Sequence, residues 1–254
     1  ELVQPEPGGQ MVVGVGLGGQ GGWQPVGDAG GHTLQQRTHD ERQPEPDGVA
    51  IAHDVHVGVA QIFGPSGHYK TFVALDLAMR IANGSDEWLG LRVKKPGPVV
   101  YCTMEGAHDW AHRIDAWLRT NGGTADDLWT LQEEELNLAD PKSIERLIVD
   151  AELMVAERRE ALGDAGPVLD PVLFVVDTQA LATPGVSEND NSEMGAVLSL
   201  LKKASIRTGA LWLTVHHTGH ASERARGASA QRAALDAEVR VMDNVVRFTK
   251  TKYS

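Results

Sequence analysis

The segment 62–71 joins a short apolar run, a turn containing glycine and proline, and a Lys-Thr pair. The apolar and β-branched residues of 57–63 predict a strand before the turn, and the apolar spacing over 72–81 predicts a helix after it. In such a loop the backbone N–H groups and the helix N-terminus bind phosphate, the lysine contacts the outer phosphates, and the hydroxyl is a ligand of Mg²⁺. Lys70 and Thr71 take these two roles, and we expect Lys70 to be a solvent-facing point charge.

The loop departs at one position from the common pattern G-x-x-x-x-G-K-[ST]. Tyr69 stands where a glycine usually precedes the lysine. A β-to-α turn that binds nothing is therefore an alternative, which residues further along the chain must help to decide. The candidate nucleotide-binding residues of the loop are Gly64, Pro65, Ser66, Gly67, His68, Tyr69, Lys70 and Thr71.

Strand and helix patterns alternate from residue 58 onward. Strands are predicted at 98–103, 172–176 and 210–215, helices at 110–119, 143–162 and 194–207, and a closing hairpin at 237–242 and 245–249. This alternation predicts an α/β fold with a mostly parallel sheet and helices on both faces. Its site is expected at the carboxyl ends of the strands.

The segment 1–57 differs in composition from the rest of the chain. Residues 1–58 contain thirteen of the 28 glycines, eight acidic residues and two basic ones, with little hydrophobic periodicity. We expect 1–57 to be mostly disordered and 58–254 to form the folded domain. The segment also contains the dinucleotide-binding pattern Gly14-x-Gly16-x-x-Gly19, but the glycines and proline that follow do not allow the helix this pattern requires.

Composition excludes some classes of protein. A net charge of −12 argues against a basic surface for duplex DNA, although a few basic loops can still hold a single strand. No apolar run approaches the ~20 residues of a membrane span, and no secretory signal is evident. The single cysteine, Cys102, predicts no disulfide framework. We therefore expect a cytoplasmic protein with no membrane association.

Two acidic residues follow predicted strands. Asp177 ends the apolar run LFVVD, where a carboxylate can hold Mg²⁺ beside a phosphate loop. Glu105 follows another strand, where a carboxylate can orient and deprotonate an attacking water. Each could instead be an ordinary solvated acid at a strand end.

Histidines end a further strand, in the sequence HHTGH. His216, His217 and His220 could form a zinc site, but no cysteine or carboxylate cluster accompanies them. We favour a histidine that donates a hydrogen bond to the terminal phosphate. The residues themselves do not decide between His216 and His217, and we take His217 as the candidate.

The order of these motifs resembles that of the RecA-like ATPases of the plasmid RepA type, relatives of the DnaB-class hexameric replicative helicases. The resemblance runs from about residue 59 to the C-terminus. The phosphate loop GPSGHYKT is similar to a family variant with tyrosine before the lysine. The other motifs are YCTMEG with Glu105, LFVVDT with Asp177, HHTG with His217, ARGASA with Arg226, and TKTK with Lys250 and Lys252. Two departures are His220, where the family commonly has lysine, and the end of the chain at Ser254, which is consistent with a C-terminally truncated domain.

The resemblance implies an ATPase, with ATP and Mg²⁺ bound between subunits of a homo-oligomer, expected to be a hexamer. Thr71 and Asp177 would hold Mg²⁺, and Glu105, Lys70, His217 and Arg226 would act in catalysis. Lys250 and Lys252 would reach the nucleotide of a neighbouring subunit. Single-stranded DNA is the implied partner, in plasmid, phage or mobile-element replication.

Two other functions remain open. One is an ATP-dependent DNA-binding switch or loader that does not unwind DNA. The other is a small-molecule kinase of the P-loop class, which is disfavoured because no lid with clustered arginines follows the core.

Overall fold

The computed structural model describes residues 57–104, 107–132, 135–163, 169–188, 190–218 and 229–252, together with two short strands at 12–17 and 23–25. A nine-stranded sheet has the order β2-β1-β11-β10-β3-β9-β8-β6-β7. Neighbouring strands from β10 to β7 are parallel, whereas β11 is antiparallel to β10. The strands of this sheet are β1 (Val12–Leu17), β2 (Trp23–Pro25), β3 (Gly58–Pro65), β6 (Val99–Thr103), β7 (Leu128–Gln132), β8 (Leu173–Asp177), β9 (Leu211–Thr218), β10 (Ala237–Met242) and β11 (Val245–Thr251).

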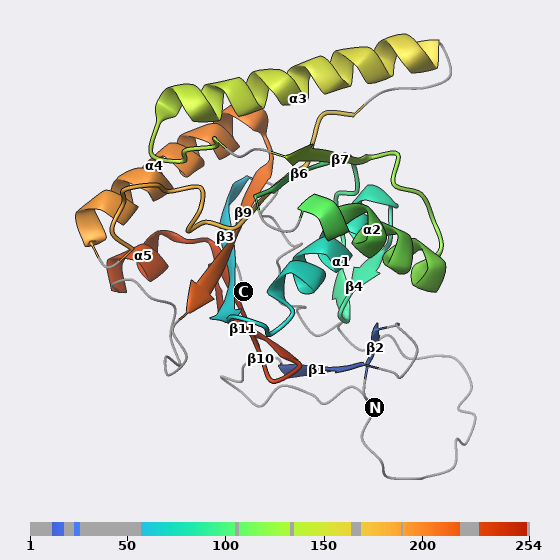
Figure 1. Ribbon diagram of the computed structural model, residues 1–254, viewed down its shortest axis with the longest axis horizontal. Coiled ribbons are helices and arrows are strands. Elements are labelled where there is room, and N and C mark those ends of the chain that lie inside the picture. The colour runs from blue at the N-terminus through green and yellow to red at the C-terminus, as the bar shows by residue number, and fades with distance from the viewer. Residues whose placement is uncertain are drawn as a thin grey trace, which may run out of the picture.

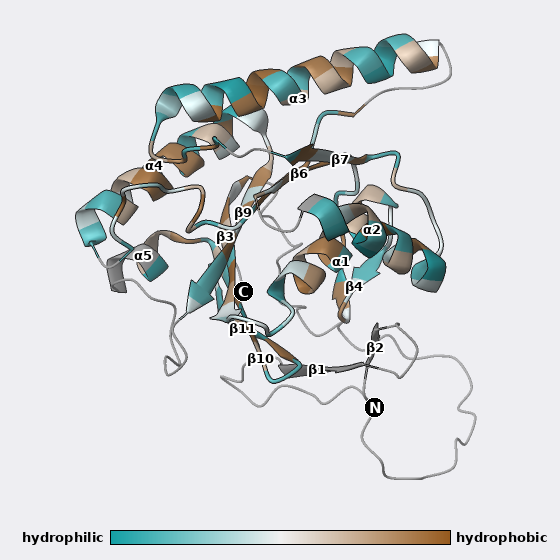
Figure 2. Ribbon diagram, viewed as in Figure 1, coloured by the Kyte–Doolittle hydropathy of each residue, from teal (hydrophilic) through white to brown (hydrophobic). Residues whose placement is uncertain are grey.

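Helices cover both faces of the sheet (Figure 1). Helices α1 (Lys70–Ala82) and α2 (Ala107–Asn121) lie on one face, and α3 (Pro141–Leu162), α4 (Asn191–Thr208) and α5 (Ser229–Ala234) lie on the other. Figure 2 shows apolar and polar segments alternating along α3, as an amphipathic helix requires. None of the helices that the structure describes has the length and apolar character needed to cross a membrane.

Each central strand contributes to two hydrophobic cores, because successive side chains point to opposite faces of the sheet. Ile62 of β3 packs in the core under α1 and α2. On the neighbouring strand, Trp212 of β9 belongs to the other core and stacks on Phe174 with ring centroids 4.6 Å apart. Central strands buried on both faces have the continuous apolar character that the sequence shows.

The carboxylate of Asp76 makes polar contacts with several elements on the α1 face of the sheet. This carboxylate accepts hydrogen bonds from the indole N–H groups of Trp117 at 2.8 Å and Trp88 at 3.0 Å. It also pairs with Arg80 one turn along α1, at 3.1 Å. Trp88 belongs to a small hairpin formed by β4 (Glu87–Trp88) and β5 (Leu91–Arg92). One carboxylate thus connects α1, α2 and this hairpin.

The α/β architecture predicted from the alternating pattern is confirmed. Every predicted strand and helix from residue 58 onward corresponds to an observed element, with ends that differ by a few residues. β7, the β4–β5 hairpin and α5 were not predicted from the sequence. These are short elements in which neither a twofold nor a 3.6-residue period is long enough to stand out.

The segment 1–57 contains two of the observed strands. β1 pairs antiparallel with β11, with Val12 opposite Arg247, and β2 pairs with β1. Nine residues for which we expect disorder are thus strand residues, and the rest of the segment up to residue 56 lies outside the described residues. Gly14 and Gly16 lie within β1, and Gly16 is opposite Gln24 of β2. This arrangement agrees with our exclusion of a dinucleotide-binding turn.

Candidate nucleotide-binding site

The loop 64–71 connects β3 to α1 at the carboxyl edge of the sheet. Tyr69 is the N-cap residue of α1 and has φ 63° and ψ 19°, in the left-handed region. Glycine adopts this conformation at little cost, which explains why the common pattern has glycine here. Tyr69 occupies the same conformation, so the loop keeps its shape despite the departure in sequence.

The loop has the features of an anion site. Gly67 has φ 78°, and a Cβ built on it would meet no atom within 4 Å, so the loop surface is open there. Within the described residues, no side chain caps the N-terminus of α1, and its first turn contains no acidic residue. The N–H groups and the positive end of the helix dipole therefore favour a phosphate. The residues present fit a nucleoside triphosphate.

The β10–β11 hairpin supports the loop from one side. A Cβ on Gly64 would lie 2.0 Å from the carbonyl oxygen of Val241 on β10, so no other residue fits at this position. His68 accepts a hydrogen bond from the backbone N–H of Asp243 at 3.0 Å. The His68 side chain therefore faces the tip of the hairpin, which leaves its backbone to contribute to phosphate binding.

Lys70 is buried, with 3% of its surface exposed. Its ammonium group donates to the carbonyl oxygen of Pro65 at 2.8 Å and lies 2.9 Å from Nδ1 of His217. The expectation of a solvent-facing lysine is therefore wrong, because the folded-back loop and the end of β9 enclose the side chain. An ammonium group has only donors, so Nδ1 of His217 must be the acceptor and the proton of the neutral ring lies on Nε2.

The two histidines of β9 point to opposite sides of the sheet. His217 lies beside Lys70, whereas His216 is fully buried on the other face with its Nδ1 3.7 Å from Oε1 of Glu188. The structure thus brings His217 and not His216 to the phosphate loop. It also separates the two rings that a shared zinc ion would need. His220 lies outside the described residues.

Asp177 ends β8 next to the loop and is buried. The hydroxyl of Tyr101 donates a hydrogen bond to its Oδ2 at 2.9 Å. Burial, and after it the charge of Asp177, raises the pKa of Tyr101 well above its usual value, so this hydroxyl stays protonated throughout the neutral range. Asp177 and the partly exposed Thr71 carry oxygen atoms of the kind that Mg²⁺ prefers, so they would fit the ion.

Replacing Tyr101 with phenylalanine should weaken Mg²⁺ binding by about 10- to 100-fold, the usual effect of removing a group that orients a metal ligand. Titrating Mg²⁺ into the nucleotide-loaded variant measures the change, and nucleotide binding without Mg²⁺ should stay as in the unmodified protein. An unchanged Mg²⁺ dependence would mean that Asp177 does not hold the ion.

Glu105 and Arg226 lie outside the described residues, so their roles stay predictions. The strand that leads to Glu105 ends at Thr103, which is the register partner of Asp177. The backbone N–H of Met104 then donates to the carbonyl oxygen of Asp177 at 2.8 Å. The chain therefore approaches Glu105 from the strand end that lies beside Asp177.

Lys250 and Lys252 lie on β11 and just after it, away from the loop. Lys250 is in register with Glu238 and through it with Gln61, which is four residues or about 13 Å before Pro65 along β3. Its ammonium group donates to three carbonyl oxygens at the C-terminal end of α5, at 2.5–3.1 Å. Lys252 pairs with Asp236 at 2.8 Å. Neither lysine is brought to the nucleotide loop of its own chain.

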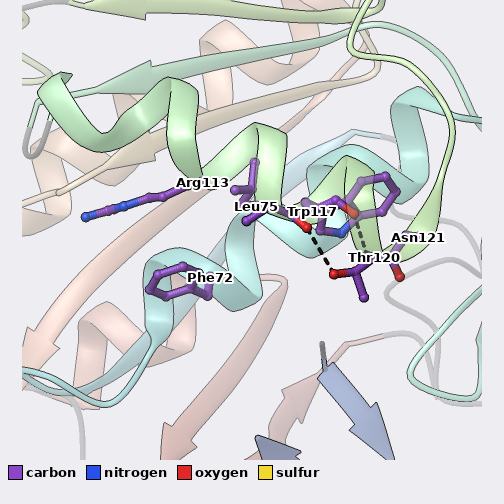
Figure 3. Close-up of a pocket in the computed structure, with 7 residues that line it drawn as sticks. Phe72, Leu75, Arg113, Trp117, Thr120 and Asn121 are labelled. Carbon is purple, nitrogen blue, oxygen red and sulfur yellow. Dashed lines mark hydrogen bonds between the residues drawn. The ribbon is translucent and has the colours of Figure 1, made fainter. Parts of the chain in front are cut away.

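Arg113 is a candidate that the sequence analysis missed. It lies on α2 with its guanidinium over the ring of Phe72, 5.3 Å from the centroid, and Phe72 directly follows Thr71. Both residues line a cavity of about 60 Å³ between α1 and α2 (Figure 3). The cavity is too small for a nucleobase, but the guanidinium and the ring lie near the loop, because Phe72 directly follows Thr71. An arginine in an amphipathic helix gives no sign of this role in the sequence.

Comparison with known proteins agrees with the geometry. No curated protein matched the chain. A family model described as an AAA domain matches residues 36–223, which is well over half of the chain and includes the loop, Glu105, Asp177 and both histidines of β9. The match begins within the segment 1–57 and ends before Arg226 and the β10–β11 hairpin. The chain therefore belongs to the AAA domain family and is a P-loop ATPase.

Proposed function

We propose that the protein is an ATP-hydrolysing motor of the RepA and DnaB helicase type that acts on single-stranded DNA as a homo-oligomer, expected to be a hexamer. The observation that carries the ATPase part is the contact of Lys70 with His217 at 2.9 Å. It joins the phosphate loop to the end of β9, next to the strand that ends in Asp177.

Each residue of the site has its own role in ATP hydrolysis. The loop backbone and Lys70 bind the phosphates, and Thr71 with Asp177 holds Mg²⁺, which neutralises phosphate charge when bound. Glu105 accepts the proton of the attacking water. His217, with its proton on Nε2, is able to donate a hydrogen bond to a phosphate oxygen. Arg113 and Phe72, which lie beside the loop, are candidates for contact with the nucleobase.

The oligomeric part of the proposal rests on distance. Lys250 is level with Gln61, about 13 Å before Pro65 along β3, and both lysines are engaged away from their own loop. We therefore expect a nucleotide that they contact to belong to another subunit. Arg226 falls in the same part of the sequence and is expected to act on a neighbour too. Such basic residues contribute about 10³- to 10⁵-fold in rate.

Mixing two inactive variants tests this arrangement. Arg226→Ala and Lys70→Met should each lose turnover, yet a mixture should recover part of it, because some interfaces then pair an intact loop with an intact arginine. Phosphate release at several mixing ratios measures the recovery. If Arg226→Ala is fully active and turnover per chain does not depend on protein concentration, the oligomeric motor is excluded.

One observation favours the second candidate, an ATP-dependent DNA-binding switch or loader without unwinding activity. Lys250 is engaged with the end of α5 in its own chain, and burial lowers its pKa. A lysine held in this way is a structural cap and not a residue extended toward a neighbour. ATP turnover with and without single-stranded DNA, beside a strand-displacement assay, separates the two: stimulation without displacement selects the switch.

A further inference from the structure

Three buried polar side chains lie beneath the nucleotide site, on the sheet face that α4 covers. Gln61 of β3, Thr214 of β9 and Gln179 just after β8 are each at most 1% exposed. The side-chain amide of Gln61 donates to Oε1 of Gln179 at 2.7 Å, and the hydroxyl of Thr214 donates to the same oxygen at 3.0 Å. Gln179 therefore links three neighbouring strands through one oxygen atom.

Gln179 also connects the site to the segment 178–188, which leaves β8 toward α4. Its backbone N–H donates to the carbonyl oxygen of Val215 at 2.8 Å. Its carbonyl oxygen accepts from the hydroxyl of Thr183, within that segment, at 2.9 Å. Gln179 is only two residues beyond Asp177 along the chain. A shift of the strand end that holds Mg²⁺ therefore reaches the segment 178–188 through this residue.

The two glutamines permit two hydrogen-bond patterns. In the observed pattern Gln61 donates to Gln179, while Oε1 of Gln61 and Nε2 of Gln179 are buried without a partner in the described part of the chain. Turning both amides over lets Gln179 donate to Gln61 and to Thr214, whose hydroxyl then accepts. The number of hydrogen bonds among the three side chains is the same in both patterns, but the second pattern also leaves the hydroxyl hydrogen of Thr214 without an acceptor in this group.

We propose that the Gln61–Gln179 pair is a two-state positioning element that couples nucleotide binding to the conformation of 178–188. The pair lies between β3, which leads to the phosphate loop, and β9, which leads to His217. The unpaired buried groups make the equilibrium between the two hydrogen-bond patterns sensitive to small movements. A movement that brings a new partner to either amide selects one pattern. This inference rests on the proposed nucleotide site and adds a route by which its occupancy is transmitted.

Hydrogen exchange of the amides in 178–188 tests the coupling, with the Mg²⁺ complex of a non-hydrolysable ATP analogue as the probe. In the unmodified chain the analogue should slow exchange by about fivefold or more, the lower end of typical coupling between sites. In Gln179→Met the effect should fall below about twofold, while the affinity for the analogue, titrated in the same samples, changes little.

A triple variant separates coupling from stability. Replacing Gln61 and Gln179 with methionine and Thr214 with valine removes every polar partner at once, so the thermal stability lost in Gln179→Met should return. Nucleotide-dependent protection of 178–188 should not return. The matched control is Ser205→Ala, which removes a buried hydroxyl at the other edge of the sheet; it should lose stability and keep the coupling.

Two results would overturn the inference. The first is unmodified protein that binds the analogue without added protection of 178–188, and the second is a triple variant that keeps the protection. An unmodified protein that does not bind the analogue would instead overturn the proposed function, and the inference with it. The titration distinguishes this case from the others.

Discussion

Replacing Lys70 with methionine should weaken nucleotide binding and lower nucleotide turnover by at least about 10²-fold, the usual cost in kcat of removing one preorganised donor to a developing anion. Methionine has similar length and fills the enclosed site between Pro65 and His217, but it carries no charge. The measurements are a fluorescence titration with a labelled nucleotide and steady-state phosphate release.

The burial of Lys70 adds a second expected effect. Pro65 and His217 each lose a donor, which costs about 1–3 kcal/mol where the acceptor is buried, or a fall of roughly 2–4 °C in Tm per kcal/mol for a chain of this size. Lys203→Met, which removes an exposed lysine of α4, is the charge-matched control and should bind nucleotide normally. A folded Lys70→Met protein with normal affinity would show that the loop is not the nucleotide site.

Glu105→Gln should keep nucleotide affinity and lose hydrolysis by about 10²- to 10⁴-fold, because the amide preserves the shape of the side chain but cannot accept the proton. The expected signature is a fall in kcat with little change in binding. Glu135→Gln, an exposed acid before α3, is the matched control. Turnover at the normal rate would place the catalytic carboxylate at another strand end.

Much of the fold could be predicted because strands and helices are indicated by local patterns of apolar residues. The apolar runs that became β3, β8 and β9 are buried on both faces, and the helices between them have long enough apolar stripes to be recognised. Parallel strands then bring their carboxyl ends to one edge, so Asp177 and the phosphate loop were expected together from order alone.

The details of the site depend on contacts between distant parts of the chain, which local patterns do not encode. The partner of Lys70 is His217, 147 residues away. Alternation along a strand predicts that His216 and His217 point in opposite directions, but which of them meets the loop depends on how β9 pairs with β3. Gln179 is an ordinary polar residue in the sequence, and only its burial between three strands indicates a role.

The β10–β11 hairpin has a mechanical consequence. Its tip, Asp243-Asn244, turns with φ 53° and 61° and touches His68 of the loop, while its other end carries the lysines held at α5 and Asp236. The hairpin therefore contacts the phosphate loop at its tip and the end of α5 through its lysines. We expect a movement of Lys250 or Lys252 to be transmitted along the hairpin to His68, so that a ligand of these lysines changes the affinity for the nucleotide.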